Sequence, residues 1–374
     1  MVSWLKRQYL NHKGWKTKEK LLVIQSDDWG SLRTSDLCSL DRLKRLGVSV
    51  ENCHYMQYDT VASDHDLERL FEVLQGVRDN HGHSAVLTAN ALVSNPDFDQ
   101  IAASGFESYH SIGLKRTFDI LRATSDGYQL GLRLWKQGQQ AGIFVPQLHG
   151  NEHLQVNRWL RQLRAGNEIL LEAFKWRMWG VSRHTSPSIE KSLQAAFEYD
   201  SVADKRFIIN RIEDAITEFQ SLFGFPSTTF TAPNYTWFPE VEDVLRNRGV
   251  CCMQSSSVQR IPRGIDVDSQ RHFNGEKSSS GLLYQVRNVH FEPAENQRIN
   301  WVDKCLREIR ASFFWGRPAI LSTHRVNYIG KHKPEIREES LSQLSELLKA
   351  IVIIWPSVQF ISSVELGRKM EEKS

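Results

Sequence analysis

The feature that most constrains the fold is an alternation of short apolar runs with amphipathic segments. Eight runs of four to eight residues are rich in aliphatic or β-branched side chains, and polar residues follow each of them. Strands buried on both faces of a parallel sheet have this pattern. The sequence therefore predicts eight buried strands, at residues 21–26, 85–88, 143–148, 228–231, 250–253, 282–289, 319–323 and 358–362.

Helical patterns lie between these runs. Residues 66–78 carry apolar side chains at helical spacing, and similar patterns occur at 241–248, 301–315 and 339–355. A strand followed by a helix, repeated along the whole chain, is typical of a parallel α/β sheet or a closed barrel. Eight strands over 374 residues favour one (β/α) barrel over two separate domains.

Two segments interrupt this pattern within the single barrel domain expected at 21–366. Residues 154–223 contain no convincing strand and predict a helical insertion, with helices at 155–165, 168–179, 189–197 and 205–223. Residues 254–280 are polar and rich in glycine and serine, which predicts a surface loop. A basic arm at 1–20 and a charged tail at 367–374 flank the domain.

Composition places the chain among ordinary globular proteins. A formal net charge of +3 gives no support for nucleic-acid binding. There is no apolar stretch of membrane-spanning length and no secretory signal pattern, and the five cysteines include the adjacent Cys251 and Cys252. We therefore expect no transmembrane segment and a cytoplasmic location, with the basic arm as a candidate contact to the inner membrane face. No oligomeric state follows from the sequence.

Adjacent carboxylates, Asp27 and Asp28, follow the first predicted strand. In a parallel barrel, functional groups gather at the carboxyl ends of the strands. Two like charges at close range raise one pKa unless a cation intervenes, and a bound metal would resolve the conflict. An Asp-Asp-x-Gly segment is also an ordinary turn sequence, so this pair alone does not decide the matter.

Histidines follow two other predicted strands. His149 and His153 are four residues apart, a spacing that brings both imidazoles to one side, and His324 ends the strand predicted at 319–323. One carboxylate with two imidazoles leaves coordination positions for water and substrate. Zn²⁺ is the first choice for this set, and iron, cobalt or manganese would also suit it. Asp27 then remains as a base and His324 as an acid, an arrangement suited to hydrolysis.

Further side chains fall near the same strand ends. Each is a candidate for binding the substrate or for stabilising an oxyanion, and each is equally explained by packing, turn formation or solvation. They are Trp29, Asn90, Pro233, Asn234, Tyr235 and Arg325.

The order of these motifs resembles that of the polysaccharide deacetylases, the NodB-homology group of carbohydrate esterase family 4. The resemblance implies a distorted (β/α) barrel of seven strands and metal-dependent removal of N- or O-acetyl groups from sugars. By motif position it implies that Asp28, His149 and His153 hold the metal. Asp27 would be the general base and His324 the general acid, with a backbone N–H near Asn234 at the oxyanion.

The chain departs from the family pattern at three positions. Gly150 replaces the usual serine or threonine, Ser322 replaces a leucine, and the segment Thr231-Ala232-Pro233-Asn234 replaces Arg-x-Pro-Tyr. The arginine that orients the base is therefore missing, with Arg325 or Arg33 as candidate replacements. The resemblance also implies an acetylated substrate, and the lack of a signal favours a nucleotide-linked sugar or a lipid-linked glycan in surface-glycan biosynthesis.

Three alternatives remain open at this level. A two-carboxylate glycoside hydrolase would need a second acid, for which Glu152 and Glu292 are candidates. A catalytically silent carbohydrate-binding barrel would account for the missing arginine and for the 11 tryptophans. Two histidines and a carboxylate also occur in metal-dependent oxygenases, although a spare adjacent aspartate suits hydrolysis better.

Overall fold

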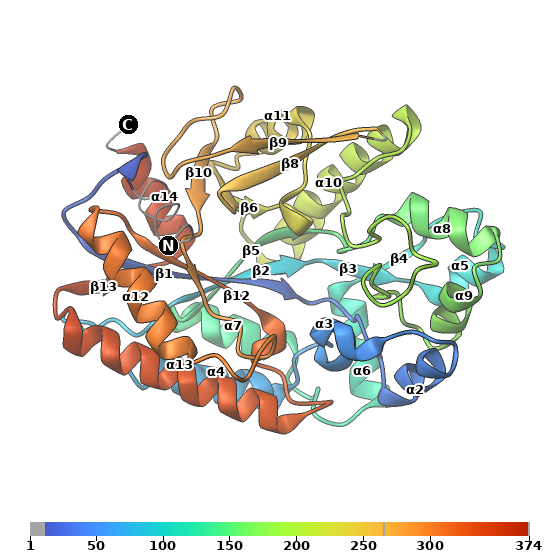
Figure 1. Cartoon of the computed structure of the whole chain (residues 1–374), viewed down its shortest axis with the longest axis horizontal. Coiled ribbons are helices and arrows are strands. Elements are labelled where there is room, and N and C mark those ends of the chain that lie inside the picture. Colours follow the sequence, from blue (N-terminus) through green and yellow to red (C-terminus); the bar gives the residue numbers. More distant parts are fainter. Residues whose placement is uncertain (1–11, 265, 373–374) are drawn as a thin grey trace.

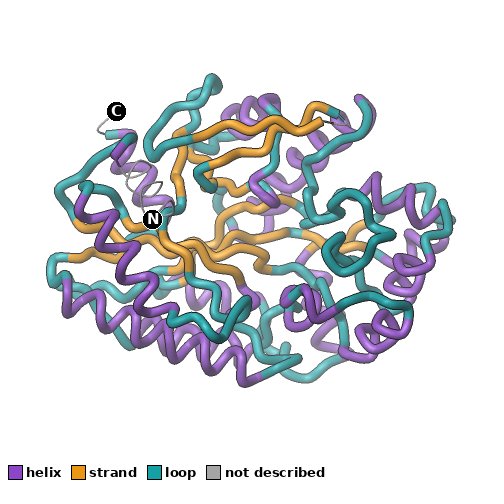
Figure 2. Tube along the Cα trace, viewed as in Figure 1, coloured by secondary structure: helices purple, strands orange, loops and turns teal. Residues whose placement is uncertain are grey.

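A curled parallel sheet forms the centre of the computed structural model, which describes residues 12–264 and 266–372 (Figures 1 and 2). The strands follow the order β10-β7-β6-β5-β2-β1-β12-β11, and β13 pairs with the start of β1. The strands are β1 (Lys20–Trp29), β2 (Leu87–Leu92), β5 (Phe144–Gly150), β6 (Thr229–Thr231), β7 (Cys252–Ser255), β10 (Leu283–Val286), β11 (Val289–His290), β12 (Ala319–His324) and β13 (Val358–Phe360).

The two edge strands of this sheet, β10 and β11, are joined by only two residues, Arg287 and Asn288. The Arg287 N–H donates to the Ser255 carbonyl at 2.9 Å, and the Asn288 N–H donates to the Ile320 carbonyl at 3.1 Å. The link thus bonds to β7 on one side and to β12 on the other, which brings the sheet edges together. The fold is a distorted (β/α) barrel, as the sequence predicts.

Helices cover the outside of the sheet. They are α4 (Asp64–Gln75), α6 (Leu114–Thr124), α7 (Leu132–Gln140), α10 (Val202–Phe223), α11 (Pro239–Asn247), α12 (Trp301–Phe314) and α13 (Pro334–Ile354), whereas α14 (Ser363–Glu371) packs on the opposite face of the sheet in a small separate core with Leu21 and Val23. The main core lies between these helices and the sheet. In α10, for example, the buried Ile212 and Phe219 face that core. The Ser201 side chain caps this helix by accepting the Asp204 N–H at 3.1 Å, and Gly224 ends it at a φ of 79°.

All eight apolar runs lie in the central sheet, with ends that shift by a few residues. The run predicted as one strand at 282–289 splits into β10 and β11. The helices predicted at 66–78, 241–248, 301–315 and 339–355 correspond to α4, α11, α12 and α13. The alternation of apolar runs and helical patterns was therefore a sound guide to the order of the elements.

A second group of helices lies at the right-hand end of Figure 1, the end toward which β1 points. It contains α2 (Leu37–Arg45), α3 (His54–Tyr58), α5 (Phe98–Ala103), α8 (Val156–Arg164), α9 (Glu168–Lys175) and the short helix η1 (Val50–Asn52). These elements enclose a separate hydrophobic core that includes Trp159 and Trp179. Both tryptophans are buried by packing, so neither offers a face to a sugar.

The structure corrects three expectations about the interrupting segments. Residues 189–197 form turns rather than a helix, although Ile189 and Leu193 join the second core. Helix α10 contacts β5, so the last part of the expected insertion is a helix of the barrel itself. The segment 254–280 is not a loop throughout, because it contains the antiparallel hairpin of β8 (Val258–Arg263) and β9 (Asp266–Arg271). A second small hairpin pairs β3 (Ser94–Pro96) with β4 (Ser111–Gly113).

Both ends of the domain are partly described. The arm expected at 1–20 is described from His12 onward, and Arg317 binds the carbonyl oxygens of His12, Gly14 and Trp15. Residues 1–11 lie outside the described residues. The charged tail expected from residue 367 begins inside α14. No helix in the described ranges combines the length and the apolar composition that a bilayer crossing requires.

Candidate active site

Asp27 and Asp28 lie at the carboxyl end of β1, where the strand is irregular. Successive side chains of a regular strand point to opposite faces. Here the pairing with β2 shifts between Ser26 and Trp29, and Asp28 has a φ of 73°, a rare value outside glycine. Both carboxylates are nearly fully buried. The irregularity gives two adjacent aspartates different partners within one site.

Asp28 lies beside two histidines from the end of β5 and the segment after it. Its Oδ1 is 3.4 Å from Nε2 of His149 and 3.7 Å from Nε2 of His153. Nδ1 of His149 lies 2.8 Å from the Thr231 carbonyl oxygen and must donate to it, which leaves its Nε2 with a free lone pair. The structure thus brings together the three residues expected as metal ligands.

This cluster fits a divalent metal ion. Asp28 Oδ1 and His149 Nε2 are buried and have no hydrogen-bond partner in the described part of the chain. Such an unsatisfied buried atom costs about 1–3 kcal/mol. Donors bound at 2.0–2.2 Å to a tetrahedral ion stand about 3.3–3.6 Å apart. The distance from Asp28 to His149, 3.4 Å, falls within that spacing, and the distance to His153, 3.7 Å, lies just beyond it, so one ion fits these three ligands after a small adjustment.

The protonation states also suit metal binding. Burial lowers the pKa of His153 to about 3, so its imidazole is neutral at physiological pH. Burial alone would raise the pKa of Asp28, but that pKa lies well below its usual value because the Arg33 guanidinium lies 3.6 Å from Asp28 Oδ2. A carboxylate with neutral imidazoles is the ligand form that a divalent metal requires.

Arg33 contacts the other oxygen of Asp28. Its Nη2 is 3.6 Å from Asp28 Oδ2, and its Nε is 3.6 Å from Asp59 Oδ2. The guanidinium lies over the rings of Tyr55 and Trp179, 4.9 and 5.3 Å from their centres. Arg33 is therefore the charged neighbour of the metal-ligand candidate. It does not replace the missing arginine beside Asp27.

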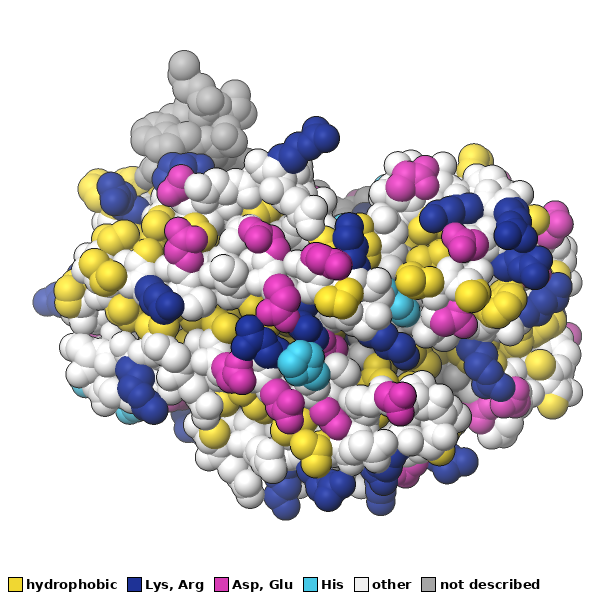
Figure 3. All heavy atoms as spheres, turned by 90° about the horizontal axis from the view of Figure 1, so that it is seen from below, with side chains coloured by type: hydrophobic (Ala, Val, Ile, Leu, Met, Phe, Trp, Pro, Cys, Tyr) yellow, Lys and Arg dark blue, Asp and Glu magenta, His cyan; other side chains and the backbone are white. Residues whose placement is uncertain are grey.

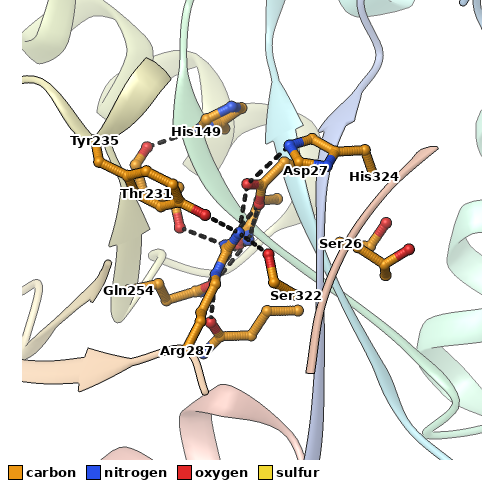
Figure 4. Close-up of polar contacts among 12 residues, drawn as sticks. Ser26, Asp27, His149, Thr231, Tyr235, Gln254, Arg287, Ser322 and His324 are labelled. Carbon is orange, nitrogen blue, oxygen red and sulfur yellow. Dashed lines mark hydrogen bonds and ion pairs between the residues drawn. The ribbon is translucent and has the colours of Figure 1, made fainter. Parts of the chain in front are cut away.

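Arg287 takes that place beside Asp27 (Figure 4). Its Nη1 donates to Oδ2 at 2.6 Å and its Nη2 donates to Oδ1 at 2.7 Å. Gln25 and the Tyr235 hydroxyl accept from the same guanidinium, and Asn90 donates to Asp27 Oδ1 at 2.7 Å. Burial alone would raise the pKa of Asp27, but Arg287 outweighs it and lowers that pKa. The proposed base is a fixed, ionised carboxylate.

His324 ends β12 and lies beside Asp27, its register partner on the neighbouring strand β1. Its Nε2 is 3.8 Å from Asp27 Oδ2, and its Nδ1 donates to Glu292 Oε1 at 2.6 Å. Asn327 holds the other oxygen of Glu292 at 2.7 Å. Burial opposes the charged imidazole, but the charge and hydrogen bond of Glu292 outweigh it and raise the pKa of His324 to about 9. His324 is therefore protonated at neutral pH.

The turn after β6 is tight and is named η2 (Pro233–Tyr235). Asn234 and Tyr235 both have positive φ values, 54° and 51°. The Tyr235 N–H donates to the Ala232 carbonyl at 3.0 Å, while the Tyr235 hydroxyl faces Arg287. Pro233 is buried and Asn234 is exposed. Because the Tyr235 N–H is already bonded within the turn, the Asn234 N–H is the one that could donate to an oxyanion.

Part of this site opens into one cavity of about 710 Å³. Its walls include the metal-ligand candidates Asp28 and His153, the acid candidate His324 and the turn residue Asn234. Tyr55, from α3, also lines it and lies edge-on to His324 at 5.3 Å between ring centres. A substrate in this cavity would touch residues from the barrel and from the second group of helices.

Two expected site residues lie elsewhere. Trp29 is fully buried, and it packs against the core rings of Trp135 and Phe144. Arg325, in the short helix η3 (Arg325–Asn327), is fully buried and donates to Asp59 Oδ1 at 2.7 Å. Neither side chain lines the cavity, so the structure gives no support to the prediction that they contact substrate. The Trp29 ring packs in the hydrophobic core, and the Arg325 guanidinium pairs with the buried Asp59.

The site also contains two residues, Arg287 and Glu292, whose roles the sequence did not predict. Arg287 is the first residue after β10, a position that the strand-end rule selects once the strand is divided correctly. Glu292 follows β11 by two residues and was considered only as a second catalytic carboxylate. No sequence pattern pairs it with His324, because the two residues meet only through the fold.

Comparisons with known proteins were made against families, curated proteins and solved structures. No family model matches the chain, and no curated protein matches it. Among solved structures, a 4-alpha-glucanotransferase from Thermococcus litoralis has 9% identity and a TM-score of 0.46, with 94% of this chain and 40% of that enzyme covered. This chain therefore spans less than half of that enzyme's length.

This chain covers a larger share of two other solved structures. A candidate polysaccharide deacetylase from Mycobacterium smegmatis has 12% identity and a TM-score of 0.41, with 96% of this chain and 93% of that chain covered. A candidate glycoside hydrolase/deacetylase from Parabacteroides distasonis has 8% identity and a TM-score of 0.48, with 96% and 73% covered. At these identities and TM-scores the activity has to be argued from the side chains of the site.

Proposed function

We propose that this protein is a metal-dependent hydrolase that removes an acetyl group, preferentially N-acetyl, from a sugar or glycoconjugate. One observation carries the proposal. A three-residue ligand cluster, an arginine-bound carboxylate and a protonated histidine come from four different strand ends and lie together beside one cavity, which Asp28, His153 and His324 line. Hydrolysis of an amide needs these three parts: an activated water, a proton acceptor and a proton donor.

Each side chain has a defined role in this proposal. A divalent metal held by Asp28, His149 and His153 would supply a water of lowered pKa and polarise the acetyl carbonyl. The Asp27 carboxylate accepts the proton of the attacking water. Nε2 of the protonated His324 donates to the leaving nitrogen. The Asn234 N–H, in a turn fixed by Pro233, donates to the oxyanion.

The low pKa of Asp27 is compatible with its role as a base. Pairing with Arg287 makes the carboxylate less basic but fixes its direction. Proton transfer is efficient when donor and acceptor differ little in pKa. A metal that lowers the pKa of its water would narrow the pKa gap to this weak base without closing it, and Arg287 and Asn90 supply the orientation that a flexible aspartate would lack.

The alternatives have less support. A two-carboxylate glycoside hydrolase needs a free second acid, yet Glu152 pairs with Arg211 at 2.7 Å and Glu292 pairs with His324 at 2.6 Å. A catalytically silent barrel was suggested by the missing arginine, and Arg287 fills that gap. Neither alternative explains why the buried atoms Asp28 Oδ1 and His149 Nε2 have no hydrogen-bond partner.

The substrate class rests on the motif order, which resembles that of the polysaccharide deacetylases. Within that class we propose an acetylated nucleotide-sugar or lipid-linked glycan of surface-glycan biosynthesis as the substrate. Zn²⁺ is the metal we propose first, because two imidazoles and one carboxylate with an open position are a common zinc arrangement.

The test combines metal analysis with acetate release. The full chain is stripped with a chelator, reloaded with Zn²⁺, Co²⁺ or Mn²⁺, and incubated with nucleotide-linked, lipid-linked and free N-acetylated sugars. We expect acetate release that requires metal and that disappears in His149→Gln. The matched control is His83→Gln, whose side chain is 68% exposed on the surface. Activity that survives chelation, or acetate release by His149→Gln, would contradict the proposal.

A further inference from the structure

Exposed apolar side chains gather at the end of the barrel opposite the cavity. Large hydrophobic side chains with substantial exposure are few in the described residues. Three of them lie at the carboxyl ends of α12 and α13: Phe314 is 77% exposed, Ile353 74% and Ile354 41%. The half-buried Trp315 and Trp355 follow directly in the sequence. We call Phe314, Trp315, Ile353, Ile354 and Trp355 the basal patch.

Contacts between separate segments hold the basal patch together. Phe313, which precedes the patch, packs edge-on against Trp355 with ring centres 5.3 Å apart. Trp315 packs against His12 of the amino-terminal arm at 5.0 Å. The Thr17 N–H donates to the Gly316 carbonyl at 2.8 Å. The ends of α12 and α13 and the described part of the arm therefore form one surface.

Basic side chains flank this surface. Lys13, Lys16 and Lys18 are exposed on the arm, and Arg310 and Lys349 are exposed on the last turns of α12 and α13. Glu346 is an exposed acid on α13. Figure 3 shows hydrophobic side chains together with Lys and Arg at the left end of the molecule, the end where α12 and α13 finish in Figure 1. The surface is thus apolar with a basic border.

We propose that the basal patch is a binding surface for an anionic membrane. Tryptophan and phenylalanine favour the interface between lipid headgroups and acyl chains, and nearby lysines and arginines are attracted to anionic headgroups. Shallow burial of the exposed Phe314 and Ile353, with electrostatic attraction of the flanking cations, is the recognised pattern of peripheral binding.

A second copy of this chain is the less suitable occupant. In a symmetric dimer the same patch would face itself, so the lysines and arginines of both copies would be brought together. Like charges at such an interface disfavour association. A surface of anionic lipid has the opposite charge and needs no matching pocket. Charge complementarity therefore favours the membrane, and this inference is independent of the proposed function.

The barrel places the cavity away from this surface. The basal patch lies where α12 and α13 end and β1 begins, whereas Asp28 and His324 lie at the carboxyl ends of their strands. A chain bound through the patch would open its cavity toward the aqueous phase. Its substrate would then approach from solution, or as a glycan long enough to extend away from the lipid surface.

The test is flotation of the full chain with vesicles. Zwitterionic phosphatidylcholine vesicles are compared with anionic vesicles that contain about 30 mol% phosphatidylglycerol. Each comparison is made at low and at high salt, because salt screens the attraction between the lysines and the lipid headgroups. We expect binding to the anionic vesicles only, and its loss in high salt. Phe314→Ser/Ile353→Ser and Lys16→Glu/Lys18→Glu should each weaken binding about tenfold or more.

Matched controls carry the same changes elsewhere on the surface. Val202→Ser/Val267→Ser alters two exposed apolar residues, and Lys115→Glu/Lys136→Glu reverses two exposed lysines. Both controls should bind as the unmodified chain does. Equal weakening by the controls, equal binding to both vesicle types, or no binding at all would overturn the proposal. So would a dimer in sedimentation equilibrium that Phe314→Ser/Ile353→Ser separates, because the occupant would then be a second copy.

Discussion

The Arg287 guanidinium donates hydrogen bonds to both carboxylate oxygens of Asp27, although the two residues are 260 positions apart in the chain. Paired hydrogen bonds of 2.6 and 2.7 Å between a planar guanidinium and a carboxylate fix the direction of the carboxylate as well as its charge. Lysine could supply the charge but not the paired geometry. The orientation of the proposed base therefore depends on a residue from the far edge of the sheet.

Removal of this guanidinium should affect both stability and turnover. Arg287→Met leaves Asp27 as an unpaired buried charge, which costs about 3–5 kcal/mol in comparable buried pairs. We expect a lower midpoint in chemical denaturation and loss of acetate release. Arg287→Lys should recover part of the stability but little turnover. The control Arg177→Met breaks an exposed pair with Asp99 and should change the free energy of unfolding by less than about 1 kcal/mol.

Exchange of each aspartate for asparagine should separate the proposed base from the proposed ligand. Asp27→Asn removes the proton acceptor, and we expect kcat to fall by about 10²–10⁴ while elemental analysis still finds metal. Asp28→Asn should instead lose metal during dialysis, because one of three ligands is weakened. If Asp27→Asn kept full turnover, or if it lost metal as readily as Asp28→Asn, the two roles would have to be reassigned.

The pairing of His324 with Glu292 should set the alkaline limit of activity. The acid must be protonated, so kcat/KM should fall as pH rises through the His324 pKa of about 9. Glu292→Gln removes the charge that raises this pKa, and the alkaline limb should move to lower pH by about one unit or more. Glu213→Gln, on the exposed face of α10, should leave the profile in place. An unchanged limb in Glu292→Gln would contradict the assignment.

The same pair makes a pH-dependent contribution to stability. The folded pKa of His324 lies above the value of about 6.5 for an unfolded histidine. The pairing therefore stabilises the fold fully below about pH 6.5, and this contribution is lost as pH rises through about 9. His324 is 24% exposed, so solvent screening reduces the effect. Denaturation midpoints of the chain and of Glu292→Gln should converge at high pH.

Arg33 should weaken metal binding by the cluster. Its guanidinium is a buried cation 3.6 Å from Asp28 Oδ2, so it competes with an ion for the same carboxylate. We expect Arg33→Gln to bind Zn²⁺ about tenfold more tightly in a competition titration with a chelating dye, a change of about 1.4 kcal/mol. Gly180→Ala should act in the same direction, because its Cβ would lie 2.2 Å from Arg33 Cγ and displace the side chain. Weaker binding in both variants would show that Arg33 instead supports the ligand geometry.

Periodicity and the strand-end rule predicted the barrel and the clustering of Asp28, His149 and His153. Both succeed because buried parallel strands must be apolar and their carboxyl ends must meet at one side. The same rule failed for Arg325, which follows β12 closely but turns into the interior to pair with Asp59. Position along a strand places a backbone, whereas the direction of a long side chain depends on packing.

Other features depend on contacts that no local pattern encodes. Arg287 was hidden because two strands in direct succession look like one apolar run. The hydrogen bond between Glu292 and His324 joins residues that are 32 positions apart in the chain. Helix α10 was taken for part of an insertion because the polar turns before it obscure its place beside β5. In each case the deciding interaction is tertiary.

The two-residue link between β10 and β11 joins the two edge strands of the sheet and also carries Arg287. Any loosening of this junction moves the guanidinium, and with it the alignment of Asp27. On gradual heating, catalytic competence should therefore vanish a few degrees before the helices melt. Local opening at the junction would abolish turnover while most of the fold stays intact. The temperature at which turnover is lost should therefore lie below the unfolding temperature measured by calorimetry.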